Sequence, residues 1–589
     1  MQTNDSFINK ILKKYLFPTI LTILGTTITS FINSLIVGNR IGSEALSAMN
    51  IVSSFTFLFA MLGCLISIGA SSAASVAIGK EDHEAVGKYI SYAFLASVIV
   101  PVLLSVPILV TFKDFMMLLG ADENLYLVSL DYARIVIAAG FLTTLMYYPF
   151  NFLRLDGRAT YALLVFGLMT VTDVILLFVF TGLGLGLKGV GLAVVISTLI
   201  ADTAGILCLF SNKTGIIKWT WFKLSEIGRL TSDVWTRGAA AGLNNLCNML
   251  RTLILNAWIL KSFGTGKAAE FAVACAIINM TAASVSGCGQ TIVPLTGIFY
   301  GEKDSSSLKI VMKSGVKYAV IIHTLLCICA IPLTGYLVRA FGISEGAAAK
   351  EAATALIWVF VSLIPASVLN VFIYYYSTLR KALLSCVLTA MRALAFVLLF
   401  AYIFIRFGLS GYFYASFLLA ELASLLMMFL MGYINRIRHP EKSGILYMEK
   451  MPDDRYISFS VKSTTEGAVE ASSRIADFCI DHNLDKKFKS FLSMSIEEML
   501  IIINEHCLKE NPEEYIDVRI YFDDDGLIMR IRCGGLRFDP VSWYKKKCRE
   551  MTAEEIMMDE SLGMKMIVKN AKSVVYQNTF GTNNLIIAL

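Results

Sequence analysis

The residue that most directly suggests chemistry is an acid inside an apolar segment. Asp173 lies in Met169-Thr-Val-Thr-Asp-Val-Ile-Leu-Leu177, and no basic residue lies within one helical turn of it. An ionisable side chain in a bilayer costs about 3 kcal/mol or more and is a functional candidate by default. Such a carboxylate could take up a proton or cation on one side and release it on the other. We expect a coupling role; a structural hydrogen bond is the alternative.

Uncharged polar side chains in later apolar segments predict the lining of a substrate cavity. They are Asn244, Asn245, Asn248, Asn279 and Gln290. Four charged residues in similar surroundings, namely Asp202, Arg251, Arg392 and Glu421, are expected to pair across helices, because charges in hydrocarbon need partners.

Other kinds of site have little support. The 12 cysteines contain no CxxC pair, so we expect no metal centre and no disulfide framework. The net charge of +6 divides into +11 for residues 1–452 and −5 for residues 453–589, and neither value suggests nucleic acid as a partner. No catalytic residue is predicted.

Composition places most of the chain in a membrane. The 589 residues are 56% hydrophobic and 16% charged, with a mean hydropathy of +0.66. Residues 453–589 hold 41 of the charged side chains, so the C-terminal part has the composition of a soluble domain.

Segments of roughly 20 apolar residues are long enough to cross the hydrocarbon as helices. Twelve are predicted, at about 15–38, 46–78, 88–111, 128–152, 159–181, 188–210, 236–261, 268–299, 313–340, 351–377, 382–405 and 410–434. With the N-terminus in the cytoplasm, 21 Lys and Arg fall on the cytoplasmic side and 8 on the other, which predicts cytoplasmic N- and C-termini in a cell-membrane protein.

A repeat divides the spans into two halves. Ala77-Ile-Gly-Lys-Glu-Asp82 resembles Phe299-Tyr-Gly-Glu-Lys-Asp304, and the interval from Gly79 to Gly301 is the same as the interval from Gly42 to Gly264. Two pseudo-symmetric six-helix halves with a shared cavity are predicted. The expected domains are residues 1–211 and 236–437 for the halves, 212–235 for a cytoplasmic connector, 438–455 for a linker and 456–589 for the soluble domain.

The first 437 residues resemble the MATE (multidrug and toxin extrusion) family. The resemblance lies in Pro18…Asn33-Ser-Leu-Ile-Val-Gly38…Gly42-x-x-Ala45-Leu-Ser-Ala48, in Gly287-x-Gly-Gln-x-x-x-Pro294…Tyr300-Gly301 and in the glycine-rich segment that follows Asp173. It implies export of amphipathic, often cationic small molecules in exchange for H⁺ or Na⁺. At the position where the family usually has an acid in its first span, this chain has Asn33, so cation coupling is assigned to Asp173 with Asn33 beside it.

The tail alternates helix and strand. Strands are predicted at 456–461, 515–522, 527–532, 573–578 and 584–589, with helices at 464–482 and 485–508, which together predict a cytoplasmic α/β sandwich. The segment resembles the ATP-binding domain of anti-sigma-factor and histidine kinases (the GHKL fold), through Glu497-Glu498…His506, Asp525-Gly526, Gly535, Leu562-Gly563 and Gly581-Thr-Asn583.

Glu498, Gly535 and Gly563 are therefore candidate nucleotide-binding residues, but the site departs from the family pattern. Ile502 stands where the resemblance implies a Mg²⁺-binding Asn, and Cys533 stands where it implies an adenine-contacting Asp. Mg²⁺ requires oxygen ligands that an alkyl side chain lacks. We therefore expect a regulatory or docking module that meets a cytoplasmic regulatory protein, with no cofactor.

The sequence thus predicts a secondary active antiporter. Two alternatives remain: a membrane-tethered serine kinase-like signalling protein, for which the tail argues, and a lipid-linked precursor flippase of the same superfamily. The flippase would need a large basic cavity, and few basic residues besides Arg251 and Arg392 lie inside the spans.

Overall fold

The computed structural model describes residues 5–118, 123–211, 216–340, 347–449, 455–509, 514–523, 526–550, 562–579 and 581–589. The chain divides into two compact units, which we describe separately. The larger is helical and comprises Lys14–Asp304 and Val311–Tyr447; the smaller contains the C-terminal domain from Met448 to Leu589.

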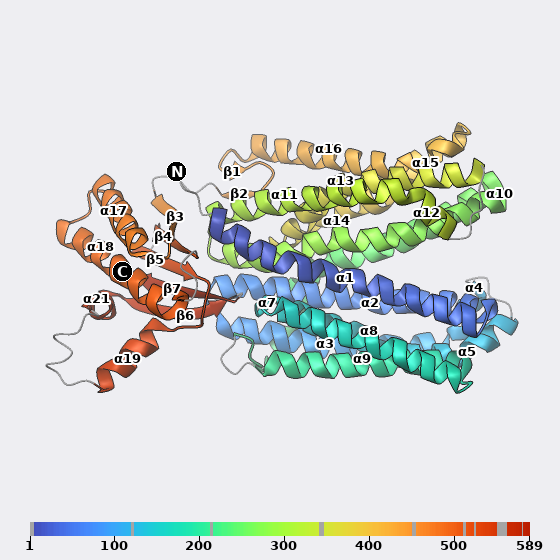
Figure 1. Ribbon diagram of the computed structural model, residues 1–589, viewed down its shortest axis with the longest axis horizontal. Helices are drawn as coiled ribbons and strands as arrows, with labels where there is room; N and C mark the ends of the chain where they lie inside the picture. The colour runs from blue at the N-terminus through green and yellow to red at the C-terminus, as the bar shows by residue number, and fades with distance from the viewer. Residues whose placement is uncertain are drawn as a thin grey trace. The chain divides into compact units, whose positions relative to one another are not determined.

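The first half of the helical unit contains nine helical segments, coloured blue to teal in Figure 1, within the residues that the structure describes. They are α1 (Asp5–Arg40), α2 (Ser43–Gly79), α3 (His83–Val110), α4 (Phe112–Leu118), α5 (Glu123–Ala138), α6 (Gly140–Leu145), α7 (Tyr147–Leu155), α8 (Ala159–Gly182) and α9 (Gly186–Phe210). Asp82 caps α3, because its side chain accepts a hydrogen bond from the Ala85 backbone NH.

The second half follows the short η1 (Leu224–Glu226) and is coloured green to orange in Figure 1. Its segments are α10 (Ile227–Gly301), α11 (Ser305–Ala330), η2 (Ile331–Leu333), α12 (Thr334–Ala340), α13 (Ala347–Thr378), α14 (Ala382–Ala390), the π-helical η3 (Met391–Ala395), α15 (Phe396–Arg406), η4 (Ser410–Tyr412) and α16 (Ala415–Arg438). The long α10 is broken at Gly264, whose φ of 83° lies in the left-handed region that glycine tolerates.

The repeat spacing found in the sequence recurs in the backbone. Gly42 and Gly264 both have positive φ, and so do Glu81 and Lys303, which are separated by the same interval. This interval also relates α3 to α11 at their first residues and α4 to α12 at both ends. Each half has its own hydrophobic core, and a small separate cluster of Ile68, Ala241, Val293 and Tyr374 joins them.

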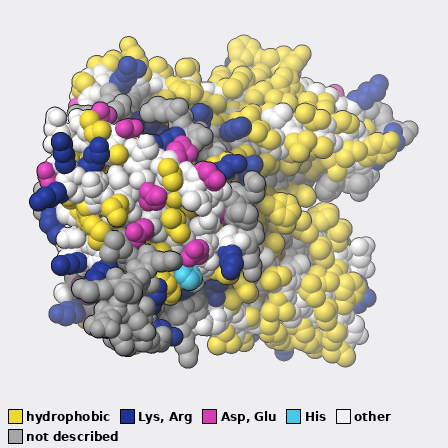
Figure 2. Space-filling model, turned by 60° about the vertical axis from the view of Figure 1, so that its left-hand side comes forward, with side chains coloured by type: hydrophobic (Ala, Val, Ile, Leu, Met, Phe, Trp, Pro, Cys, Tyr) yellow, Lys and Arg dark blue, Asp and Glu magenta, His cyan; other side chains and the backbone are white. Residues whose placement is uncertain are grey.

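Within the described residues, nine helices are long and apolar enough to cross a membrane, or ten if the bent pair Glu123–Ala138 and Gly140–Leu155 forms one span. The twelve predicted spans are not confirmed by this count, which does not include α10. That helix contains the cavity amides together with several glycines, serines and threonines, which lower its hydropathy. The lobes of the helical unit present a largely hydrophobic surface with a notch between them (Figure 2).

Glycines bring the two halves into close contact along α2 and α10. A Cβ on Gly69 would overlap the carbonyl oxygen of Val234, and one on Gly238 would overlap that of Leu65. Likewise, Gly79 and Gly301 face each other. These contacts all involve the part of α2 from Leu65 to Gly79, and we call them the glycine seam. Since only glycine lets two backbones approach this closely, the seam fixes how the halves meet at this end.

The C-terminal domain contains a five-stranded antiparallel sheet in the order β3-β4-β5-β7-β6. Its strands are β3 (Tyr456–Lys462), β4 (Tyr515–Asp523), β5 (Gly526–Cys533), β6 (Ser573–Thr579) and β7 (Thr582–Ala588). Its helices are α17 (Thr465–Asp481), α18 (Lys486–Ile503), the π-helical η6 (Asn504–Leu508), α19 (Pro540–Glu550) and α21 (Leu562–Asn570); two short strands, β1 (Lys442–Ser443) and β2 (Met448–Glu449), precede them.

The predicted strands and the two long helices of this domain are confirmed to within a few residues. Residues of α17, α18 and α21 share one hydrophobic core with the strands, including Ile475, Met499, Ile531 and Ile567. The classification as an α/β sandwich of the ATP-binding type stays a prediction. Asp524 and Asp525, in the predicted hairpin turn, lie outside the described residues.

The glycine seam generates a prediction about conformation. Gly238→Ala adds a methyl group that overlaps the Leu65 carbonyl, so the halves should separate at this end. Spin labels at Lys80 and Lys303, in a cysteine-free background, should then show a longer inter-label distance by electron paramagnetic resonance. Gly167→Ala is the matched control, because a Cβ on this helical glycine meets no atom within 4 Å. An unchanged distance in Gly238→Ala would contradict the role of the seam.

Candidate functional site

Asp173 lies at a junction of three helices of the first half. Its side chain is only 3% exposed on α8. Asn33 of α1 donates a hydrogen bond from Nδ2 to Asp173 Oδ2 at 2.7 Å, and Ser197 of α9 donates from Oγ to Oδ1 at 3.2 Å. No cation forms an ion pair with Asp173 among the residues that the structure describes. The two residues assigned to coupling are thus in direct contact.

Asn33 leaves an acceptor atom unused. Its amide oxygen Oδ1 is buried, and no hydrogen-bond partner is found for it within the described chain. One helical turn earlier on both helices, the Thr29 and Thr170 hydroxyl groups are 2.9 Å apart. A carboxylate and an unpaired amide oxygen on neighbouring helices are suitable ligands for a proton-bearing group or a small hard cation.

Asp202 departs from the prediction that it pairs across helices. It lies on α9, beyond Ser197, and is 2% exposed, and neither carboxylate oxygen has a hydrogen-bond partner among the described residues. An ionised group in this setting would be uncompensated, which is costly. The prediction of a pair was wrong here, because the sequence cannot show which residues a helix face meets. Asp202 is a second buried acid in the half that contains Asp173.

The second half contains a cavity between α10, α13, η3 and α16. Its volume is about 50 Å³, and two of the predicted cavity residues, Asn244 and Asn248, lie in its wall. Asn245 is half-buried and Asn279 is exposed, and neither lines this cavity. The wall also includes Asn370 and three charged residues, Arg251, Arg392 and Glu421, which sequence reasoning treated separately.

Two of these charges form the predicted interhelical pair. Arg392 Nε donates to both carboxylate oxygens of Glu421, at 2.9 and 2.8 Å. Arg392 lies in η3, and the π-helical turn there inserts a residue into the helix, which is common at functional sites. Arg251 instead lies over the Phe417 ring, 5.3 Å from its centroid.

Gln290 lies outside the cavity and joins the two halves. Arg154 of α7 donates from Nη2 to Gln290 Oε1 at 3.1 Å and also to Asn151, while Gln290 Nε2 donates to the Tyr374 hydroxyl at 3.3 Å. Tyr374 and the two tyrosines that follow it, Tyr375 and Tyr376, are all buried in the bundle.

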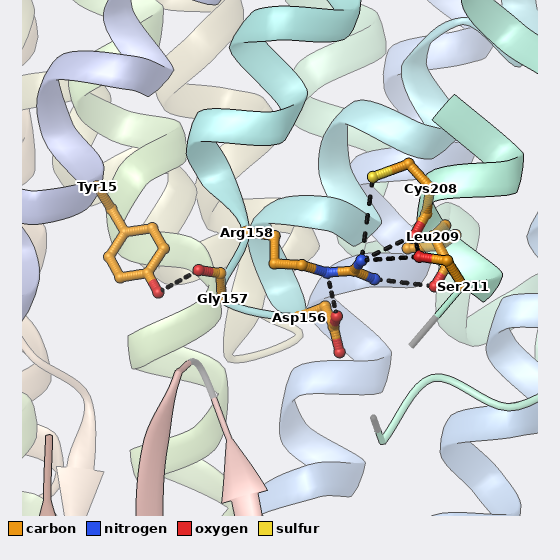
Figure 3. Close-up of polar contacts among 7 residues, drawn as sticks. All are labelled: Tyr15, Asp156, Gly157, Arg158, Cys208, Leu209 and Ser211. Atoms are coloured by element: carbon orange, nitrogen blue, oxygen red, sulfur yellow. Dashed lines mark hydrogen bonds and ion pairs between the residues drawn. The ribbon is translucent and has the colours of Figure 1, made fainter. Parts of the chain in front are cut away.

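The loop between α7 and α8 is held by Arg158 (Figure 3). Its guanidinium pairs with Asp156 at 2.7 Å and donates to the carbonyl oxygens of Cys208 and Leu209 at the end of α9, at 2.7 and 2.9 Å. Helix C-termini carry unpaired carbonyls and partial negative charge, which explains the choice of a basic residue. Tyr15 of α1 donates to Gly157 in the same loop at 2.8 Å, so one loop ties three helices together (Figure 3).

In the C-terminal domain, the predicted nucleotide residues do not form an open site within the described chain. Ile502 is buried in the core, and Asn504 accepts a hydrogen bond from Ser463. Gly535 has a φ of 81° and packs so closely on the Cys507 carbonyl that a Cβ would overlap it. Gly563 lies in the first turn of α21, and Glu498 is half-buried on α18.

The hollow between β5, β7 and η6 has a volume of only about 10 Å³, and most of its lining is apolar. Cys507 and Cys533 line it; the hydrogen bond between them lowers the pKa of the Cys507 thiol and raises the pKa of Cys533. Burial raises the pKa of Tyr576 to about 12, so its hydroxyl stays protonated and donates to Asn583 Oδ1 at 2.6 Å. Asn583 in turn donates to the carbonyls of Gly534 and Leu536, so it holds in place the loop that contains Gly535.

Comparison with known proteins shows to which family the helical unit is similar. The MatE family model matches residues 18–179 and again residues 240–403, and the two matches start at the interval that separates Gly42 from Gly264. Over 196 residues the chain is 29% identical to "Probable multidrug resistance protein YoeA" of Bacillus subtilis (strain 168). That match covers 31% of this chain and 41% of the relative, so it spans less than half of the relative's length.

Three solved structures share the fold. A crystal structure of MATE in complex with MaL6 superimposes with a TM-score of 0.69 at 21% identity, over 74% of this chain and 98% of the other. An outward-facing multidrug resistance MATE family transporter of the MOP superfamily gives 0.69 at 20% identity, over 75% and 100%. A MOP superfamily transporter from Pyrococcus furiosus, whose title reports reverse polarity of the binding pocket, gives 0.68 at 21% identity, over 75% and 100%.

The geometry of the C-terminal domain predicts weak or absent nucleotide binding. Mg²⁺-ATP offered to the full-length protein in nanodiscs should show no saturable binding below millimolar concentrations, because the metal-ligand position is an alkyl chain and the hollow is small. A fluorescent ATP analogue competed with unlabelled ATP measures this. Saturable Mg²⁺-dependent binding, or phosphate transfer to a protein substrate, would contradict the expectation and favour the kinase-like alternative.

Proposed function

The chain belongs to the MatE family, and on that premise we propose that it is a secondary active antiporter that exports amphipathic or cationic small molecules in exchange for H⁺ or Na⁺. The helical unit is that of a multi-pass membrane transporter. The relative named as a multidrug resistance protein supports small-molecule substrates. Neither the coupling ion nor the cargo follows from the family alone.

The observation that carries the proposal is the environment of Asp173. The acid is buried and contacts only neutral hydrogen-bond donors, Asn33 and Ser197, in the part of the chain that the structure describes. A buried carboxylate without a fixed counter-ion gains stability from a mobile proton or cation. Because the three helices that hold it belong to one half, movement of that half against the other would change the side from which the ion enters.

The arrangement of the halves supports alternating access. In the structure the halves meet along the glycine seam and through Arg154 and Gln290. We propose that the break at Gly264 separates two spans of α10, which with the ten apolar helices gives twelve spans in two six-helix halves. Both termini then lie in the cytoplasm, and the seam is at the cytoplasmic end.

The C-terminal domain is proposed to be regulatory rather than catalytic. Its sheet and helices form a complete core, while the positions that would bind Mg²⁺ and adenine hold Ile502 and Cys533. Such a domain retains surfaces for a cytoplasmic protein without nucleotide chemistry. The kinase-like alternative would require nucleotide binding, which the preceding prediction tests.

Gradient-driven efflux tests the function. In proteoliposomes, H⁺ and Na⁺ gradients are imposed separately. Wild-type protein should move an amphipathic dye under at least one of them, either the cation ethidium or an anion such as carboxyfluorescein. Asp173→Asn keeps the hydrogen-bond geometry but removes the titratable charge, so gradient-driven transport should fall at least tenfold.

Asp131→Asn is the matched control, because Asp131 is an exposed acid at another helix surface and its loss should leave the rate within about twofold. Wild-type rates in Asp173→Asn would exclude Asp173 as the coupling group. If neither gradient moves either dye with wild-type protein, antiport of these compounds is contradicted.

A further inference from the structure

We propose that the cavity of the second half binds the anionic head of an amphipathic substrate, a carboxylate or phosphate group, with Arg251 as the binding cation. The inference deepens the proposed function, on which it rests for the direction of transport. It assigns a substrate class to a pocket in the half that does not contain Asp173.

The charges of the cavity do not balance. Arg392 and Glu421 neutralise each other through a bidentate pair whose side chains are 11% and 12% exposed. Arg251 is 9% exposed; among the described residues no ion pair or hydrogen bond is found for its guanidinium, which lies over the Phe417 ring. The three charged residues therefore leave one positive charge in the cavity wall.

A surplus buried cation is unfavourable unless a counter-charge arrives. Burying a charge without a partner is strongly unfavourable even after relaxation, and a cation–π contact offsets only part of that cost. An anionic ligand would supply the missing charge, and the planar guanidinium matches carboxylate and phosphate oxygens in bidentate geometry.

The remaining wall suits an amphipathic molecule. Asn244, Asn248 and Asn370 offer amide donors near the cation, while Ile278, Val285 and Leu363 form apolar wall. The cavity volume of about 50 Å³ is room for a few water molecules, so it fits a carboxylate or phosphate head with the rest of the molecule outside it. The same anionic head could belong to a membrane lipid or to a soluble organic anion, and the experiment separates these sources.

The repeat shows that Arg251 is a feature of this half alone. The interval that relates Gly42 to Gly264 relates Thr29 to Arg251, and Thr29 hydrogen-bonds to Thr170 without any charge. The interval between the starts of α8 and α14, at Ala159 and Ala382, likewise relates Met169 to Arg392. The fold therefore forms without charges at these positions, so the charged pocket has a purpose beyond packing.

Equilibrium binding to the full-length protein in nanodiscs tests the inference without any gradient. The probes are dodecyl phosphate, its uncharged analogue dodecyl maltoside, dodecyltrimethylammonium as the cationic match, and inorganic phosphate for a soluble anion. Dodecyl phosphate should bind at least tenfold more tightly than either of the other dodecyl compounds. Competition by inorganic phosphate would indicate a soluble anion, and its failure to compete would indicate a lipid-like ligand; either supports the anionic pocket.

Variants locate the binding. Arg251→Gln should lower dodecyl phosphate affinity at least tenfold, Arg251→Lys should lower it less because charge is kept, and Arg134→Gln, which removes an exposed arginine elsewhere, should not change it. Thermal unfolding of each variant verifies that it folds. Equal binding of the anionic and cationic probes, or unchanged affinity in Arg251→Gln, would overturn the proposal. If wild-type protein binds dodecyl phosphate but shows no gradient-driven transport, the antiport mechanism is overturned and the anionic pocket is not.

Discussion

A polar side chain inside the helical unit must find its partner in the protein, because hydrocarbon provides none. Most do: Asn33 and Ser197 satisfy Asp173, and Glu421 satisfies Arg392. Two charged residues of this unit stand apart among those that the structure describes, Asp202 in the first half and Arg251 in the second. Their signs are opposite and they belong to different halves. The first half therefore contains an acid without a partner, and the second half contains a basic residue without one, among the described residues.

This asymmetry arose within a nearly exact repeat. The first helix of each half and the helix that begins at Ala159 or Ala382 carry the polar sites in both halves. In the second half, however, the position equivalent to Asn33 is Leu255, a fully buried core residue. The polar site has moved from there to Arg251, which is about 6 Å or one turn along the helix. Two halves built on one repeat therefore present different chemistry at different depths.

Features with a strong local signature could be predicted from the sequence. The strands of the C-terminal domain follow from alternation and turn residues, and the repeat follows from the spacing of Gly42 and Gly264. The contacts across helices could not, because hydropathy does not reveal which face meets which helix. Asp202 was expected to pair but has no partner among the described residues, and Gln290 bridges the halves instead of lining the cavity of the second half. A glycine seam is likewise visible only once α2 and α10 are placed together.

In the proposed antiport, the seam would let two separate sites act in one cycle. The cores of the two halves are distinct, and besides the Arg154–Gln290 hydrogen bond and one small apolar cluster the halves touch backbone against backbone at Gly69, Gly79 and Gly238. Such contacts have little side-chain interdigitation to break, so the cost of parting is small compared with unpacking either core. A ligand that neutralises Arg251 and an ion that neutralises Asp173 each stabilise the half that binds it. Neither requires the other's side chains, so in the proposed antiport their coupling would pass through the contacts between the halves, which are the glycine seam, the Arg154–Gln290 hydrogen bond and the small apolar cluster around Tyr374.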